Sequence, residues 1–198
     1  MAKIIQQLSE LDLNLQYSYA DYLLWRFQER VELIRGKVRQ MAAPSTLHQS
    51  ISGATYLALG NHVKKSPCKV FSAPFDVRLT PTKPVSDGKI YDVVQPDIVV
   101  VCDPTKLDAR GCLGAPDLVV EILSPGNNQK EIKDKFELYE SNGIREYWIV
   151  APTEQTVQVN RLVDGHYVPT RLFSRGDVVH SSVLDNFWLD LNEIFEKE

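Results

Sequence analysis

The chain has 198 residues, enough for one domain with a substantial hydrophobic core. Hydrophobic residues make up 43% and charged residues 24% of the chain, values typical of a soluble globular protein. The formal net charge of -4 argues against a dedicated DNA-binding protein, which usually carries a basic excess. It does not argue against an enzyme that neutralises phosphates with a metal ion.

The sequence carries no signal-peptide pattern and no apolar stretch of about 18 residues, so we expect no contact with a membrane. Cys68, Cys102 and Cys112 form no CxxC pair and no ligand cluster with the four histidines. A sparse, odd set of cysteines is typical of reduced thiols in the cytosol. We therefore predict a soluble, cytoplasmic protein.

The amino-terminal part predicts a helix, a hairpin and a second helix, after residues 1–16, which we expect to dock loosely. Ser18 is a suitable N-cap for a short helix with aromatic anchors. Strand-like segments at 31–34 and 37–41 flank Arg35-Gly36, which predicts a β-hairpin. A helix is expected over about 47–64, where the apolar residues follow helical spacing.

The middle of the chain predicts three strands. Residues 69–79 alternate between apolar and polar positions, and Pro74 places this strand at an edge or a bulge. A polar loop over 80–91 precedes a strand at 95–102, and a loop at 103–116 leads to a strand at 117–123.

The remaining elements are a helix, a strand and a tail of hairpins. A helix over about 128–142 separates the strand at 117–123 from one at 146–150, and such a crossover favours parallel pairing. The tail predicts a hairpin at Asp164-Gly165, short strands to about residue 184, and a short terminal helix with Leu191, Ile194 and Phe195. The core order of helix, strand, strand, strand, helix, strand predicts one α/β domain over residues 1–198, built on a mixed sheet with flanking helices.

Two of the predicted strands each carry a carboxylate within an apolar run. Burying Asp97 and Glu121 costs several kcal/mol unless they are paired, protonated or bound to metal. Antiparallel pairing of the two strands would bring both side chains to neighbouring positions on one sheet face. Carboxylate oxygens suit Mg²⁺ or Mn²⁺, so the pattern predicts a metal site that cleaves phosphodiesters.

A lysine on the helix predicted after the Glu121 strand would face the sheet that carries the two carboxylates. At about 100° per residue, Lys135 falls within the apolar arc marked by Phe136, Leu138 and Tyr139. It could orient water or neutralise a phosphate there. Pairing of Lys135 with Glu131, one turn earlier, is the structural alternative.

Several segments together resemble the bacterial Uma-two family of restriction endonucleases, within the PD-(D/E)XK nuclease superfamily. The segments are Pro96-Asp97, Glu121-Ile122-Leu123-Ser124-Pro125, Lys135, Tyr139, Gly143-Ile144-Arg145-Glu146-Tyr147-Trp148-Ile149-Val150, and upstream Glu32-Leu33-Ile34, Gly36, Met41-Ala42-Ala43-Pro44-Ser45 and His48. The resemblance covers roughly residues 18–185. It implies a restriction-endonuclease-like fold and a metal-dependent endonuclease acting on DNA, with Asp97 and Glu121 as metal ligands. A homodimer fits such an enzyme, because cutting two strands often takes two active sites.

Three positions depart from the expected pattern: Leu123 stands where the superfamily has a lysine two residues after Glu121, Glu131 stands where aspartate is expected, and Gly126 replaces a serine. The Uma-two pattern places a lysine on the next helix instead, which Lys135 matches. The departure at Leu123 keeps open an alternative function, a catalytically inactive nuclease-fold module that binds nucleic acid or protein.

Three further residues are candidates for the same site. Glu32 adds a third catalytic carboxylate on the resemblance, while His48 and Asp76 are candidates for contacting substrate. Each has a structural alternative: an exposed hairpin glutamate, a histidine at a helix start, and a strand residue that faces solvent. Asp97 could likewise cap amides at the start of its strand, and Glu121 could belong to a structural ion pair.

Overall fold

The computed structural model describes residues 4–80, 86–125 and 129–195. A mixed central sheet holds β3 (Lys69–Ser72), β6 (Ile98–Val101), β9 (Leu118–Ile122), β10 (Glu146–Ala151), β11 (Thr156–Val163), β12 (His166–Pro169) and β13 (Phe173–Ser174). The strand order is β12-β11-β10-β9-β6-β3, and β13 pairs with β11. As predicted, β9 is antiparallel to β6 and parallel to β10, and β11 and β12 form the hairpin around Asp164-Gly165.

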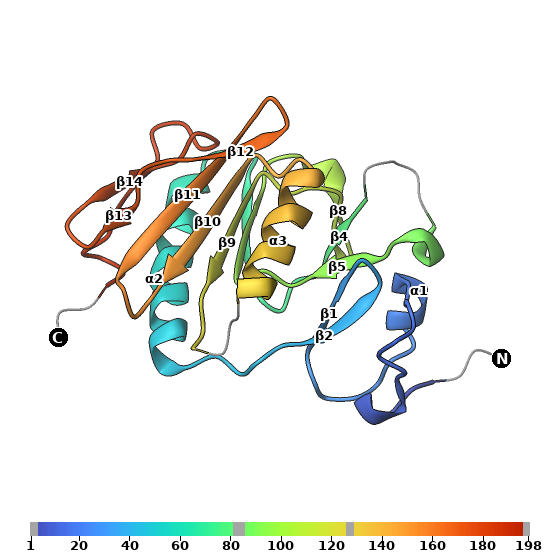
Figure 1. Cartoon of the computed structure of the whole chain (residues 1–198). Helices are drawn as coiled ribbons and strands as arrows, with labels where there is room; N and C mark the ends of the chain where they lie inside the picture. Colours follow the sequence, from blue (N-terminus) through green and yellow to red (C-terminus); the bar gives the residue numbers. More distant parts are fainter. Residues whose placement is uncertain (1–3, 81–85, 126–128, 196–198) are drawn as a thin grey trace.

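Two helices cover opposite faces of this sheet (Figure 1). Helix α2 (Thr46–Val63) lies on one face and α3 (Gln129–Ser141) on the other. Successive strand residues point to opposite faces: Ile98 and Val100 join the core cluster of α2, whereas Val99 joins that of α3. The strands are therefore apolar on both faces, as buried strands between two helical layers must be.

A second sheet packs on the α3 side. Its strands are β1 (Val31–Ile34), β2 (Lys37–Gln40), β4 (Val77–Leu79), β5 (Asp92–Val94), β7 (Leu107–Asp108) and β8 (Gly111–Leu113), in the order β2-β1-β5-β4-β8-β7. Val77 and Val94 share a core cluster with Tyr139 of α3. The short helix α1 (Tyr19–Tyr22) covers this second sheet through Tyr19, which packs with Leu33. The amino-terminal segment adds a bridge between Ile5 and Trp25.

Single turns of 3-10 helix and a small third sheet complete the described structure. They are η1 (Leu8–Glu10), η2 (Asp87–Lys89), η3 (Pro104–Lys106), β14 (Val178–His180) and β15 (Trp188–Asp190). The predicted terminal helix is wrong, because residues 191–195 form turns after β15. Leu191, Ile194 and Phe195 are nevertheless buried in the cluster that contains α2. A segment this short gains too little from helix propensity, so packing decides its conformation.

The middle strands differ from the prediction in one respect. The predicted strand at 69–79 is split, with β3 in the central sheet and β4 in the second. The break falls at Ala73-Pro74, where proline offers no amide hydrogen for the ladder. Strand β5 comes before the predicted strand at 95–102, and β7 and β8 lie inside the predicted loop at 103–116.

The prediction that all cysteines are reduced is wrong, because Cys68 and Cys102 form a disulfide. Lys69 of β3 lies opposite Val101 of β6, so the next residues along the ladder are also neighbours. This pairing joins positions 34 residues apart, which cysteine spacing alone does not reveal. Within the described ranges, no helix is long and apolar enough to cross a membrane.

Candidate active site

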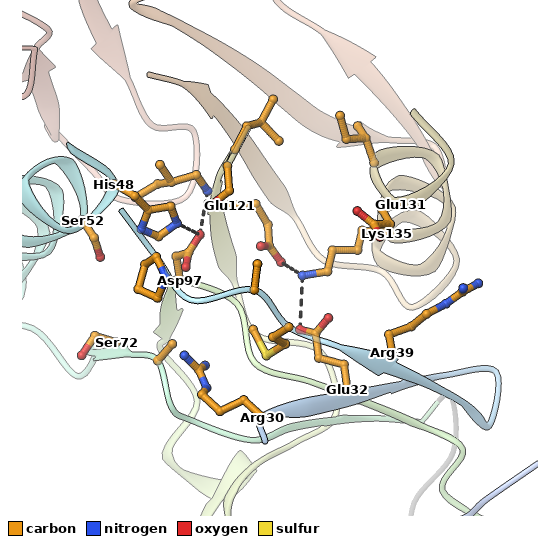
Figure 2. Close-up of a pocket in the computed structure, with 18 of the residues that line it drawn as sticks. Arg30, Glu32, Arg39, His48, Ser52, Ser72, Asp97, Glu121, Glu131 and Lys135 are labelled. Carbon is orange, nitrogen blue, oxygen red and sulfur yellow. Dashed lines mark hydrogen bonds and ion pairs between the residues drawn. The ribbon is translucent and has the colours of Figure 1, made fainter. Parts of the chain in front are cut away.

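A cavity of about 460 Å³ opens between α2, α3, the β1–β2 hairpin and the ends of β6 and β9 (Figure 2). Five of the six residues predicted for the site line it: Glu32, His48, Asp97, Glu121 and Lys135. They come from five separate segments of the chain. The strand pairing and the two helical layers therefore produce the convergence that the sequence predicted.

Asp97 lies immediately before β6, where its ladder with β9 ends. The last paired residues are Ile98 and Val120, so the amide of Ile122 has lost its strand partner on this side. The Asp97 carboxylate takes that place, with Oδ2 accepting a hydrogen bond of 2.7 Å from the Ile122 amide. The structural alternative for Asp97 is thus partly correct. Its side chain is still 17% exposed and remains open to the cavity.

His48 lies in the first turn of α2 and reaches Asp97 across the cavity wall. Ser45 caps this helix by accepting the His48 amide, while Nε2 of the imidazole lies 3.2 Å from Asp97 Oδ2. Burial lowers the pKa of His48, but the hydrogen bond and the charge of Asp97 outweigh burial, so the pKa is raised overall. Nδ1 is buried without a hydrogen-bond partner among the described residues. His48 therefore contacts a predicted metal ligand.

Glu121 is held from α3 by two residues one turn apart. Its Oε1 accepts hydrogen bonds from Lys135 Nζ at 2.8 Å and Tyr139 Oη at 2.6 Å. Residues spaced four apart share one helix face, which explains why both side chains reach the same oxygen. Burial raises the pKa of Glu121 to about 7; Lys135 opposes this shift, and the negative charges of Asp97 and Glu32 add to it.

Lys135 bridges two glutamates rather than pointing to solvent. Its Nζ lies 3.2 Å from Glu32 Oε1 as well as 2.8 Å from Glu121 Oε1. Burial acts to lower the pKa of Lys135, but the two carboxylates outweigh it and raise that pKa. Lys135 therefore stays an ammonium group at neutral pH.

Glu32 is buried, which removes the alternative of an exposed hairpin glutamate. Its side chain is 4% exposed. Its Oε1 also accepts a hydrogen bond of 2.8 Å from the backbone N–H of Gln95. All four residues of β1 are buried, because the second sheet is covered on both sides. A buried charge at this position is compensated by Lys135, as buried charges generally must be.

The structure places Asp76 away from this cavity. Its Oδ1 accepts a hydrogen bond from Gln95 Nε2 at 2.9 Å, and its Oδ2 lies 3.5 Å from the Tyr19 hydroxyl. Neither the predicted substrate contact nor the solvent-facing alternative fits this position. The sequence predicts one straight strand over residues 69–79, but the break at Ala73-Pro74 redirects Asp76 toward α1.

Two residues at or beside the cavity were not predicted as site residues. Arg30 lines its wall, and Gln95 links Arg30 to the backbone that carries Asp97. Neither residue belongs to a motif with a chemical signature, and only the packing of the β1–β2 hairpin onto β5 brings them together.

Two carboxylates of the cavity are the candidate metal ligands. Within the described ranges, no group of three or more His, Cys, Asp or Glu side chains could hold a metal ion. Asp97 and Glu121 instead provide two carboxylates from neighbouring strands, and their mutual repulsion contributes to the raised pKa of Glu121. Magnesium is typically held by one or two carboxylates, with water and substrate phosphate completing its shell. The two carboxylates are therefore compatible with Mg²⁺ or Mn²⁺.

The arrangement of the sheets and helices defines a restriction-endonuclease-like fold. Residues 19–192 match the profile of the Uma2 family, whose description is "Putative restriction endonuclease", and the chain belongs to this family. A crystal structure of "a putative nuclease belonging to DUF820" from Anabaena variabilis has a TM-score of 0.71 and 22% identity, covering 90% of this chain and 97% of that one. This likeness confirms the fold class.

A curated relative is similar in sequence as well. "Uncharacterized protein slr1290" from Synechocystis is 27% identical over 142 residues, which cover 70% of each chain. Its name assigns no activity. Membership in the Uma2 family supports a nuclease.

Proposed function

We propose that the protein is a metal-dependent endonuclease that hydrolyses DNA phosphodiester bonds. One observation carries the proposal: Asp97, Glu121 and Glu32 converge with the ammonium group of Lys135 in one open cavity. Membership in the Uma2 family supports the same activity. Stabilising ion pairs alone would not require an open cavity of this size at their centre.

Asp97 and Glu121 are the proposed metal ligands. When bound, Mg²⁺ or Mn²⁺ supplies positive charge that stabilises the phosphate in the transition state and promotes ionisation of water. The chain holds both ligands in place beforehand. The Ile122 amide and His48 fix Asp97, while Tyr139 fixes Glu121.

Lys135 is the proposed catalytic ammonium group. The superfamily lysine position is occupied by Leu123, and Lys135 of α3 takes the place of that lysine by contacting the Glu121 carboxylate. Its Nζ donates hydrogen bonds that can orient the attacking water or a non-bridging phosphate oxygen. The water gives up one proton to solvent and its oxygen bonds to phosphorus, while the bond to the leaving sugar oxygen breaks. That oxygen then takes a proton from solvent. Glu32 holds Lys135 on the side opposite Glu121.

Nicking of supercoiled plasmid by purified variants tests this assignment. Asp97→Asn and Lys135→Met should each lower Mn²⁺-dependent nicking at least a hundredfold, because each removes a charge that acts on the transition state. Asp164→Asn, in the exposed turn between β11 and β12, is the matched control and should cut like the wild type. Full activity of Asp97→Asn in a clean preparation would refute the assignment.

The alternative of an inactive module gives a different result in the same samples. An inactive module would show neither nicking nor Mn²⁺ binding at Asp97 and Glu121 in a manganese-soaked crystal measured by anomalous scattering. Cutting of both DNA strands would take two copies of the site, so the proposal includes a homodimer. Sedimentation analysis tests that part separately.

A further inference from the structure

The cationic side chains that line the cavity differ in how they are paired. Lys135 lies between two glutamates, and Arg39 Nη2 lies 3.3 Å from Asp134 Oδ2. Arg30 makes no ion pair with any carboxylate in the described part of the chain. A partly buried arginine without a carboxylate partner keeps its full charge available to an anion.

A neutral amide holds Arg30 in position. Gln95 Oε1 accepts two hydrogen bonds from Arg30, at 3.1 Å from Nε and 2.9 Å from Nη2. The Gln95 amide cannot turn over, because its Nε2 donates to Asp76 Oδ1 at 2.9 Å and lies 3.1 Å from the Tyr22 hydroxyl. Its oxygen must therefore face Arg30. Gln95 orients the guanidinium without neutralising it.

The hydrogen bonds to Gln95 leave one edge of the guanidinium open. They use the side formed by Nε and Nη2, so Nη1 and the second Nη2 hydrogen remain for another acceptor. Figure 2 shows Arg30 on the wall opposite α3, with its guanidinium on the same side of the site as Asp97. Two adjacent N–H groups in a plane match two oxygens of a phosphate.

The charge of the cavity limits where a phosphate can bind. The side chains that line it include three cations and these five carboxylates: Glu32, Asp97, Glu121, Glu131 and Asp134. An anion is repelled by this set until a divalent cation balances the excess negative charge. Lys135 and Arg39 are paired with carboxylates, so Arg30 is the lining cation whose charge no carboxylate of the described residues offsets, and it can contact a further phosphate directly.

We propose that Arg30 forms a phosphodiester-binding subsite, with Gln95 as its positioning residue. The subsite binds a backbone phosphate of the nucleic-acid substrate through the open edge of the guanidinium. The identity of that substrate rests on the proposed nuclease function, whereas binding of a phosphodiester by Arg30 does not require cleavage.

Fluorescence anisotropy of a labelled 16-base-pair duplex, with Ca²⁺ in place of Mg²⁺, tests the subsite. Arg30→Ala should weaken duplex binding about tenfold to a hundredfold, the range for one charge-assisted pair. Arg30→Lys should recover part of the affinity, because it keeps the charge but not the planar fork. Arg175→Ala changes net charge equally in the turn after β13, outside the cavity, and should bind like the wild type.

Salt dependence and a second variant separate direct contact from structural damage. For Arg30→Ala, loss of one phosphate contact should make the negative slope of log affinity against log salt shallower by about 0.9. Gln95→Met keeps Arg30 but removes the two hydrogen bonds that orient its guanidinium. The affinity of this variant for the duplex should therefore lie between those of Arg30→Ala and the wild type. Thermal melts by circular dichroism check that each variant is folded.

The outcomes distinguish this inference from the nuclease proposal. Unchanged affinity and salt slope in Arg30→Ala would overturn the subsite, even if Asp97→Asn abolished nicking. A wild-type protein that fails to bind the duplex would overturn it too. Arg30-dependent binding by a protein that cuts nothing would support the subsite and refute the nuclease.

Discussion

At the scale of single residues, buried charge alone does not identify the site. Glu121 and Glu146 are both buried strand glutamates. Glu146 accepts a hydrogen bond of 2.8 Å from the Trp148 indole and hydrogen bonds from Ser182, so it ties the carboxyl-terminal segment to β10. Glu121 differs because other carboxylates repel it and because it borders an open cavity. The crowding of like charges, rather than burial, is the functional signal.

The raised pKa of Glu121 predicts how stability without metal depends on pH. A carboxyl group whose pKa rises from 4.5 to about 7 on folding binds its proton more tightly in the folded state. Its contribution to stability is therefore present below pH 4.5 and is lost as pH rises through about 7. Glu121→Gln removes this titration, so its melting temperature in EDTA should fall less between pH 5 and 8 than that of the wild type.

Thermal melts in EDTA at several pH values measure this difference. Each kcal/mol is worth roughly 2–4 °C for a chain of this size. Glu154→Gln, in the exposed turn between β10 and β11, is a suitable control and should follow the wild type. Parallel curves for Glu121→Gln and wild type would contradict the assigned shift.

At the scale of elements, α2 and α3 each cover one sheet face and each supply one of the predicted site residues that line the cavity. His48 comes from the first turn of α2, and Lys135 from the middle of α3. The helical spacing of apolar residues predicted both helices, because burial of one face dominates their stability. The split of residues 69–79 between two sheets was not predicted, because alternation shows which side chains are buried but not against which sheet.

Replacing a glycine by alanine should have opposite effects on stability at two positions, Gly111 and Gly60. Gly111 of β8 has a φ of +116°, and an added Cβ would lie 2.2 Å from the Asp76 carbonyl oxygen. Gly111→Ala should therefore destabilise the protein by several kcal/mol, since backbone must move. Gly60, inside α2, would meet nothing within 4 Å, so Gly60→Ala should stabilise by about 1 kcal/mol.

Urea unfolding of both variants provides the measurement. The pair controls for the substitution itself, because each adds one methyl group to a glycine. A Gly111→Ala protein as stable as the wild type would show that β8 does not approach β4 this closely.

At the scale of the whole molecule, the Cys68–Cys102 disulfide joins the segment after α2 to the end of β6. Closing a loop between residues 34 apart restricts the unfolded chain and is worth roughly 4 kcal/mol in the chain-entropy description. Cys68→Ala/Cys102→Ala should lose about this much stability. Reduction of the wild type should have a similar effect.

Urea unfolding with and without a thiol-free reductant such as a phosphine tests this prediction. The double variant is its own control, because the reductant should leave its midpoint unchanged. A wild-type midpoint that does not respond to reductant would contradict a stabilising disulfide.

The sequence by itself determined the elements that burial and local chemistry dictate. Helical spacing, strand-like apolar runs and the Arg35-Gly36 turn predicted most helices and the first hairpin, and carboxylates inside apolar runs marked Asp97 and Glu121. These signals are local: they depend on neighbours within a few residues. Helical spacing also placed Lys135 on the side of its helix that faces the sheet, whereas Glu32 was assigned only by the family resemblance.

Only the tertiary structure decided which distant residues meet. Lys135 bridging Glu32 and Glu121, Gln95 holding Arg30, the removal of Asp76 from the cavity and the pairing of Cys68 with Cys102 all depend on how two sheets and two helices pack. Such contacts join segments dozens of residues apart, and their energy comes from packing that no local pattern encodes. The cavity exists because those layers leave the ends of β6 and β9 open at one edge.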